Sequence, residues 1–212
     1  MKPKIACLPD GPYKLAEPLP GLRRESGEPF AVAGSVALCR CGGSRKKPFC
    51  DGTHRTNGFS DAKLADGRND RRESHAGKRI TIHDNRGLCS HAGFCTDSLK
   101  SVFRMGSEPW IDADGASVDE IVATIRKCPS GALSYSLDGV EHRDQAREPA
   151  VTVTDHGPYA VTGGVELAGA AFGDGASREH YTLCRCGASR NKPFCDGSHW
   201  DANFQDPGTD RV

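Results

Sequence analysis

The sequence predicts an α+β protein in which two small β-rich modules flank a third small domain of mixed strands and helices. One observation is an internal repeat: residues 37–54, ALCRCGGSRKKPFCDGTH, return almost unchanged as residues 182–199, TLCRCGASRNKPFCDGSH. Another is composition, since only 36% of the 212 residues are hydrophobic, while 25 are glycine and 13 are proline. This is little apolar material for one large core, and it favours small modules stabilised in part by metal sites.

The repeat extends beyond its cysteines. Each copy has Gly-Pro-Tyr upstream and a matching phenylalanine, Phe59 or Phe204, downstream. We therefore expect one module at residues 1–61 and another at residues 150–212. Segments rich in β-formers predict strands at residues 30–33, 151–154, 159–162 and 180–183. In each copy, the aspartate of Cys-Asp-Gly predicts the N-cap of a short helix that carries a histidine.

The segment between the repeats has a different pattern, and we expect a separate domain over residues 75–140. Residues 79–83 and 133–137 predict strands, and residues 98–105 predict a short helix. Ser117 predicts the N-cap of a helix over residues 118–127, because apolar residues recur there at helical spacing. The charged stretches at residues 61–73 and 138–148 predict solvated linkers.

Charge and hydropathy exclude several classes of protein. Lysine plus arginine equals aspartate plus glutamate, at 28 each, which argues against binding to nucleic acid or to a membrane surface. No apolar run approaches the ~20 residues of a membrane span, and the first residues do not predict a secretory signal. We therefore expect a reducing, cytoplasmic location, where ten cysteines are not explained by disulfides.

Nine of the ten cysteines fall into three sets with metal-ligand spacing, and only Cys7 stands alone. Each repeat offers three cysteines and one histidine. The candidate ligands are Cys39, Cys41, Cys50 and His54 in the first repeat, and Cys184, Cys186, Cys195 and His199 in the second. Cysteine and histidine four residues apart can present their side chains from one helical turn. Three cysteines and a histidine also form a known structural zinc set, so the spacing alone leaves zinc open.

Both copies match the pattern C-x-C-x2-[ST]-x3-P-x-C-D-G-[SAT]-H in full. In this the chain resembles the CDGSH iron–sulfur domain family, the mitoNEET-like proteins, in their tandem two-motif form. The resemblance implies that each repeat binds a [2Fe–2S] cluster through three cysteines and one histidine. Members usually form an intertwined β-rich dimer, so a tandem chain is expected to be a monomer whose repeats pair about a pseudo-twofold axis.

The third set comprises Cys89, Cys95 and Cys128, the last followed by proline. Aligned with the C-x2-C-x2-C run and C-P cysteine of bacterial ferredoxins, the set lacks its second ligand, because Ala92 occupies that position. The segment resembles the divergent single-cluster ferredoxin-like domain of the 4Fe–4S type. Three cysteines suit a [3Fe–4S] cluster, whereas a [4Fe–4S] cluster would need His91, Asp97 or solvent as its fourth ligand.

The sequence contains no phosphate-binding loop, nucleophile elbow or HExxH motif, so we expect a protein that is not an enzyme. Two [2Fe–2S] clusters and one [3Fe–4S] or [4Fe–4S] cluster would suit electron transfer to redox partner proteins. A histidine ligand that competes with protons for iron would also suit cluster storage or transfer to apo-acceptors. A zinc-bound interaction module is the third hypothesis.

Overall fold

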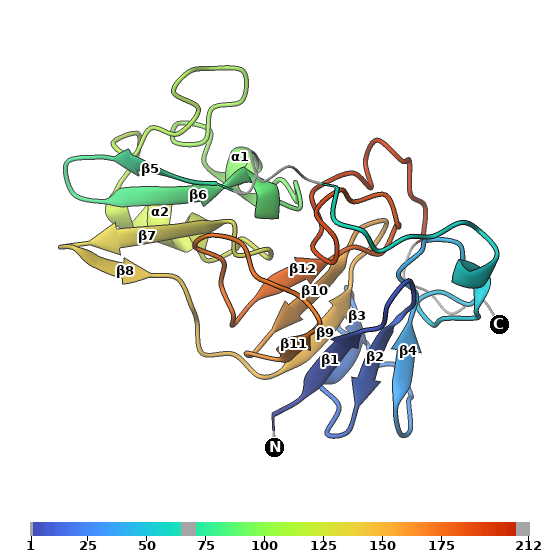
Figure 1. Cartoon of the computed structure of the whole chain (residues 1–212). Helices are drawn as coiled ribbons and strands as arrows, with labels where there is room; N and C mark the ends of the chain where they lie inside the picture. Colours follow the sequence, from blue (N-terminus) through green and yellow to red (C-terminus); the bar gives the residue numbers. More distant parts are fainter. Residues whose placement is uncertain (1, 65–70, 207–212) are drawn as a thin grey trace.

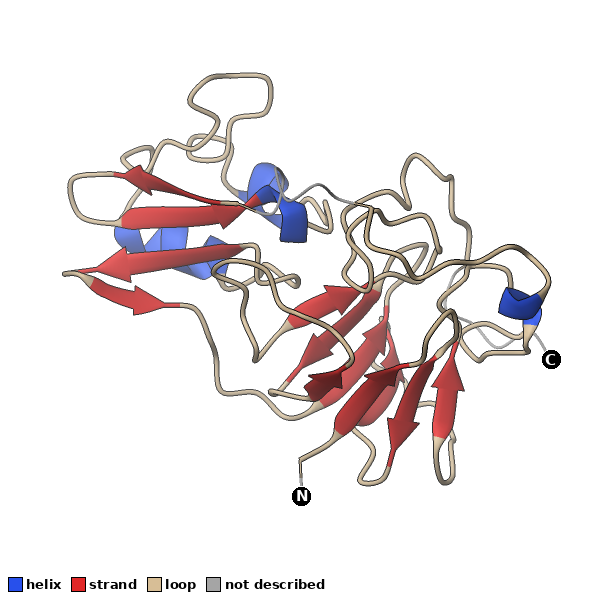
Figure 2. Cartoon of the chain, viewed as in Figure 1, coloured by secondary structure: helices blue, strands red, loops and turns tan. Residues whose placement is uncertain are grey.

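The computed structural model of the chain describes residues 2–64 and 71–206. This part is rich in strands and contains two α-helices and two short 3₁₀ turns, so the expected α+β composition is confirmed (Figure 2). Residues 1 and 207–212, at the ends of the two expected outer modules, lie outside the described residues. So do residues 65–70 of the first expected linker.

The two repeats form two four-stranded sheets, and each sheet takes one strand from the other repeat (Figure 1). The first sheet has the order β11 (Glu166–Ala168), β1 (Lys4–Cys7), β2 (Tyr13–Ala16) and β4 (Val36–Leu38). The second has the order β12 (Tyr181–Leu183), β10 (Tyr159–Thr162), β9 (Ala150–Val153) and β3 (Gly21–Arg24). The exchanged strands β3 and β11 pair in parallel with β9 and β1. The repeats are therefore interleaved.

Alternating side chains place a common core between the two sheets. In β2, Tyr13 and Leu15 are buried and their neighbours along the strand are exposed. In β10, Tyr159 and Val161 are buried in the same alternation. Inward-facing residues of both repeats form one apolar cluster, in which the rings of Tyr13 and Tyr159 meet edge to face at 6.0 Å. This burial holds the repeats together.

The middle segment forms a third sheet with a core of its own. Its antiparallel order is β5 (Arg72–Ala76), β6 (Thr81–Asn85), β7 (Leu133–Leu137) and β8 (Val140–His142). Helix α2 (Val118–Ile125) packs against β7 and buries Ile121 and Ile125. Ser117 caps α2 as predicted, because its side chain accepts from the Glu120 N–H while the Glu120 carboxylate accepts from the Ser117 N–H.

Three expected elements are wrong. The helix expected over residues 98–105 is absent, and α1 (Phe94–Ser98) ends where that helix was expected to begin. Residues 102–104 instead pair with the chain around residues 110–112, which holds them extended. The linker expected at residues 138–148 contains strand β8, and no strand forms at residues 30–33, since the next strand of the first sheet begins at Val36.

The middle segment lies against the second repeat. The Asn85 side chain donates to the Asp174 carbonyl at 2.8 Å, and Gly131 packs closely against Ser177 and His180. This contact brings the loops of the middle segment beside the cysteine loop of the second repeat (Figure 1). Within the described residues, no helix is long and apolar enough to cross a membrane.

Candidate metal centres

The four candidate ligands of the first repeat lie in two close pairs. The Sγ atoms of Cys39 and Cys41 are 3.8 Å apart, and the Sγ atom of Cys50 lies 3.4 Å from Nδ1 of His54. A tetrahedral ion with bonds of about 2.3 Å to sulfur holds two sulfurs about 3.8 Å apart. Each pair is therefore spaced to share one metal ion, and Nδ1 is the histidine atom positioned to bind.

The second repeat repeats this geometry. Cys184 and Cys186 have their Sγ atoms 3.8 Å apart, and the Sγ atom of Cys195 lies 3.5 Å from Nδ1 of His199. Among residues 2–64 and 71–206, no three histidine, cysteine or acidic side chains come close enough together to hold a single ion. The close contacts among these eight side chains are pairs.

Each pair of neighbouring thiols shares its protons unequally. The hydrogen bond from Cys39 lowers the pKa of Cys41 to about 5, while the same contact and burial raise the pKa of Cys39. Cys184 and Cys186 behave in the same way, with the pKa of Cys186 lowered to about 7. One thiolate forms readily in each pair, and a bound cation would be needed to hold both sulfurs as thiolates.

The segment that carries the candidate ligands, residues 39–54 in the first repeat and 184–199 in the second, is called the metal loop below. Motif residues that are not candidate ligands close this loop. The Ser44 hydroxyl donates to the Phe49 carbonyl at 2.6 Å and accepts from the Lys46 N–H at 3.0 Å. Ser189 makes the same two bonds in the second repeat. These bonds fold the segment between the second and third cysteines into a compact turn that brings the two ligand pairs onto one loop.

The motif aspartate is a loop anchor, and the predicted N-cap role is wrong. The short 3₁₀ turn η1 (Thr53–Arg55) has Gly52 at its N-cap, with a φ of +89°. The Asp51 carboxylate accepts from the N–H groups of Arg45 and Thr53, and the Thr53 hydroxyl bond lowers the pKa of Asp51. Asp51 therefore ties both ends of the loop together around Cys50.

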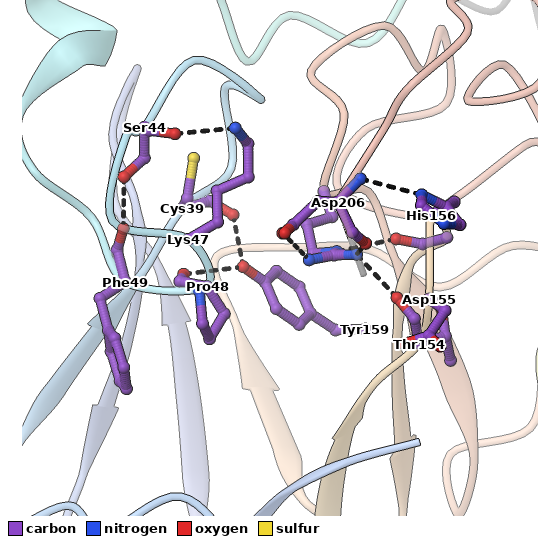
Figure 3. A network of polar contacts seen from close by, with 12 residues as sticks. Cys39, Ser44, Lys47, Pro48, Phe49, Thr154, Asp155, His156, Tyr159 and Asp206 are labelled. Atoms are coloured by element: carbon purple, nitrogen blue, oxygen red, sulfur yellow. Dashed lines mark hydrogen bonds and ion pairs between the residues drawn. The ribbon is translucent and has the colours of Figure 1, made fainter. Parts of the chain in front are cut away.

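Each repeat also supports the metal loop of the other. The Tyr159 hydroxyl donates to the carbonyls of Cys39 and Pro48 at 2.8 and 3.0 Å (Figure 3). Tyr13 donates in the same way to the carbonyls of Cys184 and Pro193, at 3.0 and 2.9 Å. Both tyrosines stand in the repeated Gly-Pro-Tyr, although the sequence predicted no role for them.

Two glycines let the metal loops touch. Gly42 and Gly187 have φ of +73° and +81°, and a Cβ on either would lie within 3 Å of a backbone carbonyl atom of the opposite loop. The carbonyls concerned belong to Cys186 and Cys41. Glycine is needed here for both the left-handed backbone and the close approach, so the two candidate centres of the repeats are neighbours.

An arginine between the paired cysteines is a further feature that the sequence analysis missed. Arg185 is fully buried, forms an ion pair with Asp206, and donates to the carbonyls of Gly157 and Thr154. Its counterpart Arg40 contacts Asp61 at 3.2 Å. The repeated Cys-Arg-Cys could have revealed both, because a buried arginine almost always has a fixed partner.

The third set of cysteines, Cys89, Cys95 and Cys128, is called the middle set below because it lies between the two repeats. The structure brings all three to one cavity of about 900 Å³. Cys89 follows the 3₁₀ turn η2 (Arg86–Leu88), Cys95 lies in α1, and Cys128 follows α2. Burial raises the pKa of Cys89 to about 12 and also raises the pKa of Cys95, with Cys128 adding to both shifts. The three thiols border one site, which favours thiolates only if a cation is bound.

The candidates for the fourth position line the same cavity. Ala92, His91 and Asp97 all border it, and the His91 ring also packs against Gly197 of the second repeat. Asp84 borders the cavity as well, although the sequence predicted no role for it. It is 2% exposed, neither carboxylate oxygen has a hydrogen-bond partner, and burial raises its pKa to about 7. Its alternation with Ile82 in β6, which turns it toward the core, was the available signal.

Residues 10–55 and 156–200 match the family described as iron-binding zinc finger, CDGSH type, and contain the two four-residue sets. The chain belongs to the CDGSH iron-binding family. Between its two CDGSH segments, residues 75–138 match the family described as divergent 4Fe-4S mono-cluster. The CDGSH assignment and the intervening iron–sulfur segment therefore agree with both resemblances seen in the sequence.

Comparison with curated proteins gives short matches. The uncharacterized protein YjdI of Escherichia coli K12 is 36% identical over 61 residues, which are 29% of this chain and 80% of the relative. YjdI of Escherichia coli O157:H7 matches to the same extent. No solved structure matches the chain. The three family segments support iron–sulfur binding by the chain.

Proposed function

We propose that this CDGSH protein is an electron carrier with three iron–sulfur centres and no catalytic activity of its own. The two CDGSH modules each hold a [2Fe–2S] cluster, on the eight paired side chains described above. Cys89, Cys95 and Cys128 hold a [3Fe–4S] or [4Fe–4S] cluster. When bound, these clusters supply one-electron redox chemistry, and the partners are redox proteins that exchange single electrons with them.

The paired ligand geometry is the observation that carries this proposal. A [2Fe–2S] cluster takes two protein ligands at each iron, whereas one zinc ion would draw all four ligands to a single point. Separations of 3.8 and 3.4 Å within the pairs of the first module fit two metal ions with two ligands each. The Gly43 N–H donates to Sγ of Cys41, and the Gly52 N–H donates to Sγ of Cys50. These bonds support the proposal further, because N–H donors stabilise anionic sulfur.

The reciprocal tyrosines and exchanged strands support a further part of the proposal. The two modules act as the halves of one pseudo-twofold unit within a monomer. Strand β3 in the second sheet has its counterpart in β11 in the first, and Tyr13 has its counterpart in Tyr159. A single chain thus supplies both halves, and the metal loops of the two halves contact each other.

The first prediction concerns the isolated protein. Purified without oxygen, it should be red-brown and contain about seven or eight iron atoms per chain, two at each CDGSH site and three or four at the middle site. Mössbauer spectroscopy of the ⁵⁷Fe-labelled protein would count the cluster types directly. A colourless protein that contains zinc after expression with ample iron would overturn the proposal in favour of a zinc-bound interaction module.

Cluster storage or delivery is the second candidate function, and one observation favours it. His54 and Cys50 border an open surface cavity of about 870 Å³, so a protein acceptor could reach this ligand pair from outside. An assay of transfer to an apo-ferredoxin separates the two functions. A delivery protein would lose its first cluster to the acceptor at a rate set by protein encounter, and an electron carrier would keep it.

The second prediction concerns the middle set. Ala92→Cys should convert it to a four-cysteine [4Fe–4S] centre, because Ala92 borders the cavity of Cys89, Cys95 and Cys128 in the register of the second ferredoxin ligand. If the wild-type centre is [3Fe–4S], its EPR signal appears when oxidised. The variant should lose that signal and give one only when reduced.

Thr96→Cys is the matched control for this change. Thr96 borders the same cavity, but its hydroxyl is turned toward the Gly93 carbonyl at 3.1 Å, out of the ferredoxin register. The control should keep the wild-type spectrum. Identical spectra for wild type and Ala92→Cys in both oxidation states would show that the register is wrong or that another residue already binds at the fourth position.

A further inference from the structure

The middle segment contacts one CDGSH module and leaves the equivalent surface of the other open. Asn191 of the second module donates to the Gly87 carbonyl at 2.6 Å, and Trp200 donates to the His91 carbonyl at 3.3 Å. The equivalent residues of the first module are Lys46 and Arg55, and both are exposed. Two sites with nearly the same sequence therefore have different surroundings.

The two glycines of Cys-Asp-Gly show the same difference at closer range. A Cβ on Gly197 would lie 2.9 Å from the ring of His91, so the imidazole rests directly on this glycine. A Cβ on Gly52 would meet nothing within 4 Å. The backbone is the same at both positions, with φ of +87° and +89°. The contact with His91 is thus specific to the second module.

The candidate ligands of the second module, which the middle segment contacts, are more buried than those of the first. Cys195 and His199 are 2% and 6% exposed, whereas Cys50 and His54 are only partly buried and border the open cavity described above. The second centre is enclosed between the middle segment and the first module. Of the two histidine ligands, His54 is the one that a partner protein can approach.

The path between the middle set and the second module is short. The His91 N–H donates to Sγ of Cys89 at 3.4 Å, and its ring touches Gly197, which lies two residues after Cys195. Trp200 adds a second contact, since its ring lies 5.3 Å from the ring of His199. From the second module, the contacts of Gly187 with Cys41 and of Gly42 with Cys186 lead on to the first.

We propose that His91, Gly197 and Trp200 couple the middle centre to the second CDGSH centre, and that the first CDGSH centre is the outlet to a one-electron carrier protein. This rests on the proposed iron–sulfur function. Along this path one electron lost by the middle centre is gained by the second CDGSH centre, with no transfer of atoms. A histidine ligand raises the potential of an iron–sulfur centre, which favours that direction.

The experiment compares Gly197→Ala with Gly52→Ala in the full chain. Both substitutions place alanine in the same left-handed conformation, so their effects on the metal loops are matched. Only the first displaces the His91 ring. The wild-type protein is reduced with dithionite, and electron spin relaxation is measured at each [2Fe–2S] signal. His54→Cys and His199→Cys identify the signals, because an all-cysteine centre has different g values.

We expect faster spin relaxation at the second CDGSH centre than at the first, caused by the nearby paramagnetic middle centre. Gly197→Ala should slow it several-fold relative to Gly52→Ala, which introduces the same backbone strain without the contact with His91. His91→Asn provides a second variant, since asparagine tolerates the positive φ of 55° at this position but is too short to keep the contact. It should act like Gly197→Ala.

The inference is overturned if the first centre relaxes faster, or if both Gly197→Ala and His91→Asn relax like the wild type. Iron and Mössbauer analysis of the same samples separates this result from failure of the proposed function. Clusters that form but are not coupled would contradict the coupling alone. Absence of clusters from the wild-type protein would contradict the iron–sulfur function itself.

Discussion

His199→Cys and His54→Cys should each keep a cluster but lower its reduction potential by on the order of 100–300 mV, because an anionic thiolate replaces a neutral imidazole. The dependence of that potential on pH should also disappear, since the titratable ligand is gone. The drop should be larger for His199, whose side chain is buried where added negative charge is poorly screened. Potentiometric titration monitored by EPR, repeated between pH 6 and pH 9, measures both effects.

The unchanged CDGSH site in each variant is the internal control, and its potential should stay near the wild-type value. A potential that still follows pH at the substituted site would show that the histidine is not the iron ligand. Loss of the cluster at only one site would show instead that the exposed and the enclosed site differ in their tolerance of a fourth thiolate.

Asp84→Asn should stabilise the middle segment at neutral and higher pH. Burial raises the pKa of Asp84 to about 7 from 3.8. Between these two pH values the folded protein therefore holds a proton on Asp84 that the unfolded chain releases. The free energy of unfolding should therefore fall as pH rises from about 4 to about 7 and stay low above that. A shift of this size corresponds to roughly 4 kcal/mol, at 1.36 kcal/mol per pKa unit. Asparagine removes this loss. The Glu73 carboxylate also raises the pKa of Asp84, while Arg86 lowers it.

Amide hydrogen exchange of β6 and α2 at pH 5 and pH 8 measures this local stability without requiring the whole chain to unfold reversibly. Wild type should lose protection at the higher pH after correction for intrinsic exchange, and Asp84→Asn should not. Asp97→Asn, a change at an exposed carboxylate of the same cavity, should alter stability by less than about 0.5 kcal/mol. Equal behaviour of all three proteins would mean that Asp84 has a partner at neutral pH.

The candidate ligands could be predicted from the sequence because local spacing determines them. Cys39 and Cys41 lie on one bend, and Cys50 and His54 lie on the next, so few conformations of the loop could separate them. The capped helix α2 was predicted for the same reason, since Ser117 and Glu120, its partner in the capping box, are three residues apart. The helix expected over residues 98–105 failed because pairing with residues 110–112 outweighed its local pattern.

The features that the sequence could not predict depend on distant contacts. Tyr159 donates to Cys39 across 120 positions of the chain, and Asn191 donates to Gly87 across 104. The exchange of β3 and β11 is equally remote, because the strands that each one joins belong to the other repeat. Asp84 illustrates a different difficulty, since a carboxylate in a strand is normally solvated and only its alternation with Ile82 marks this one as buried.

The interleaving of two repeats in one polypeptide has a consequence for how the protein can change. Two identical subunits must carry every substitution twice, so neither half can acquire a surface that the other lacks. Here the halves are encoded separately, and a lysine remains at position 46 where its counterpart, Asn191, anchors a neighbouring domain. A single substitution can therefore adapt one half to an internal contact while the other half stays open to visiting proteins.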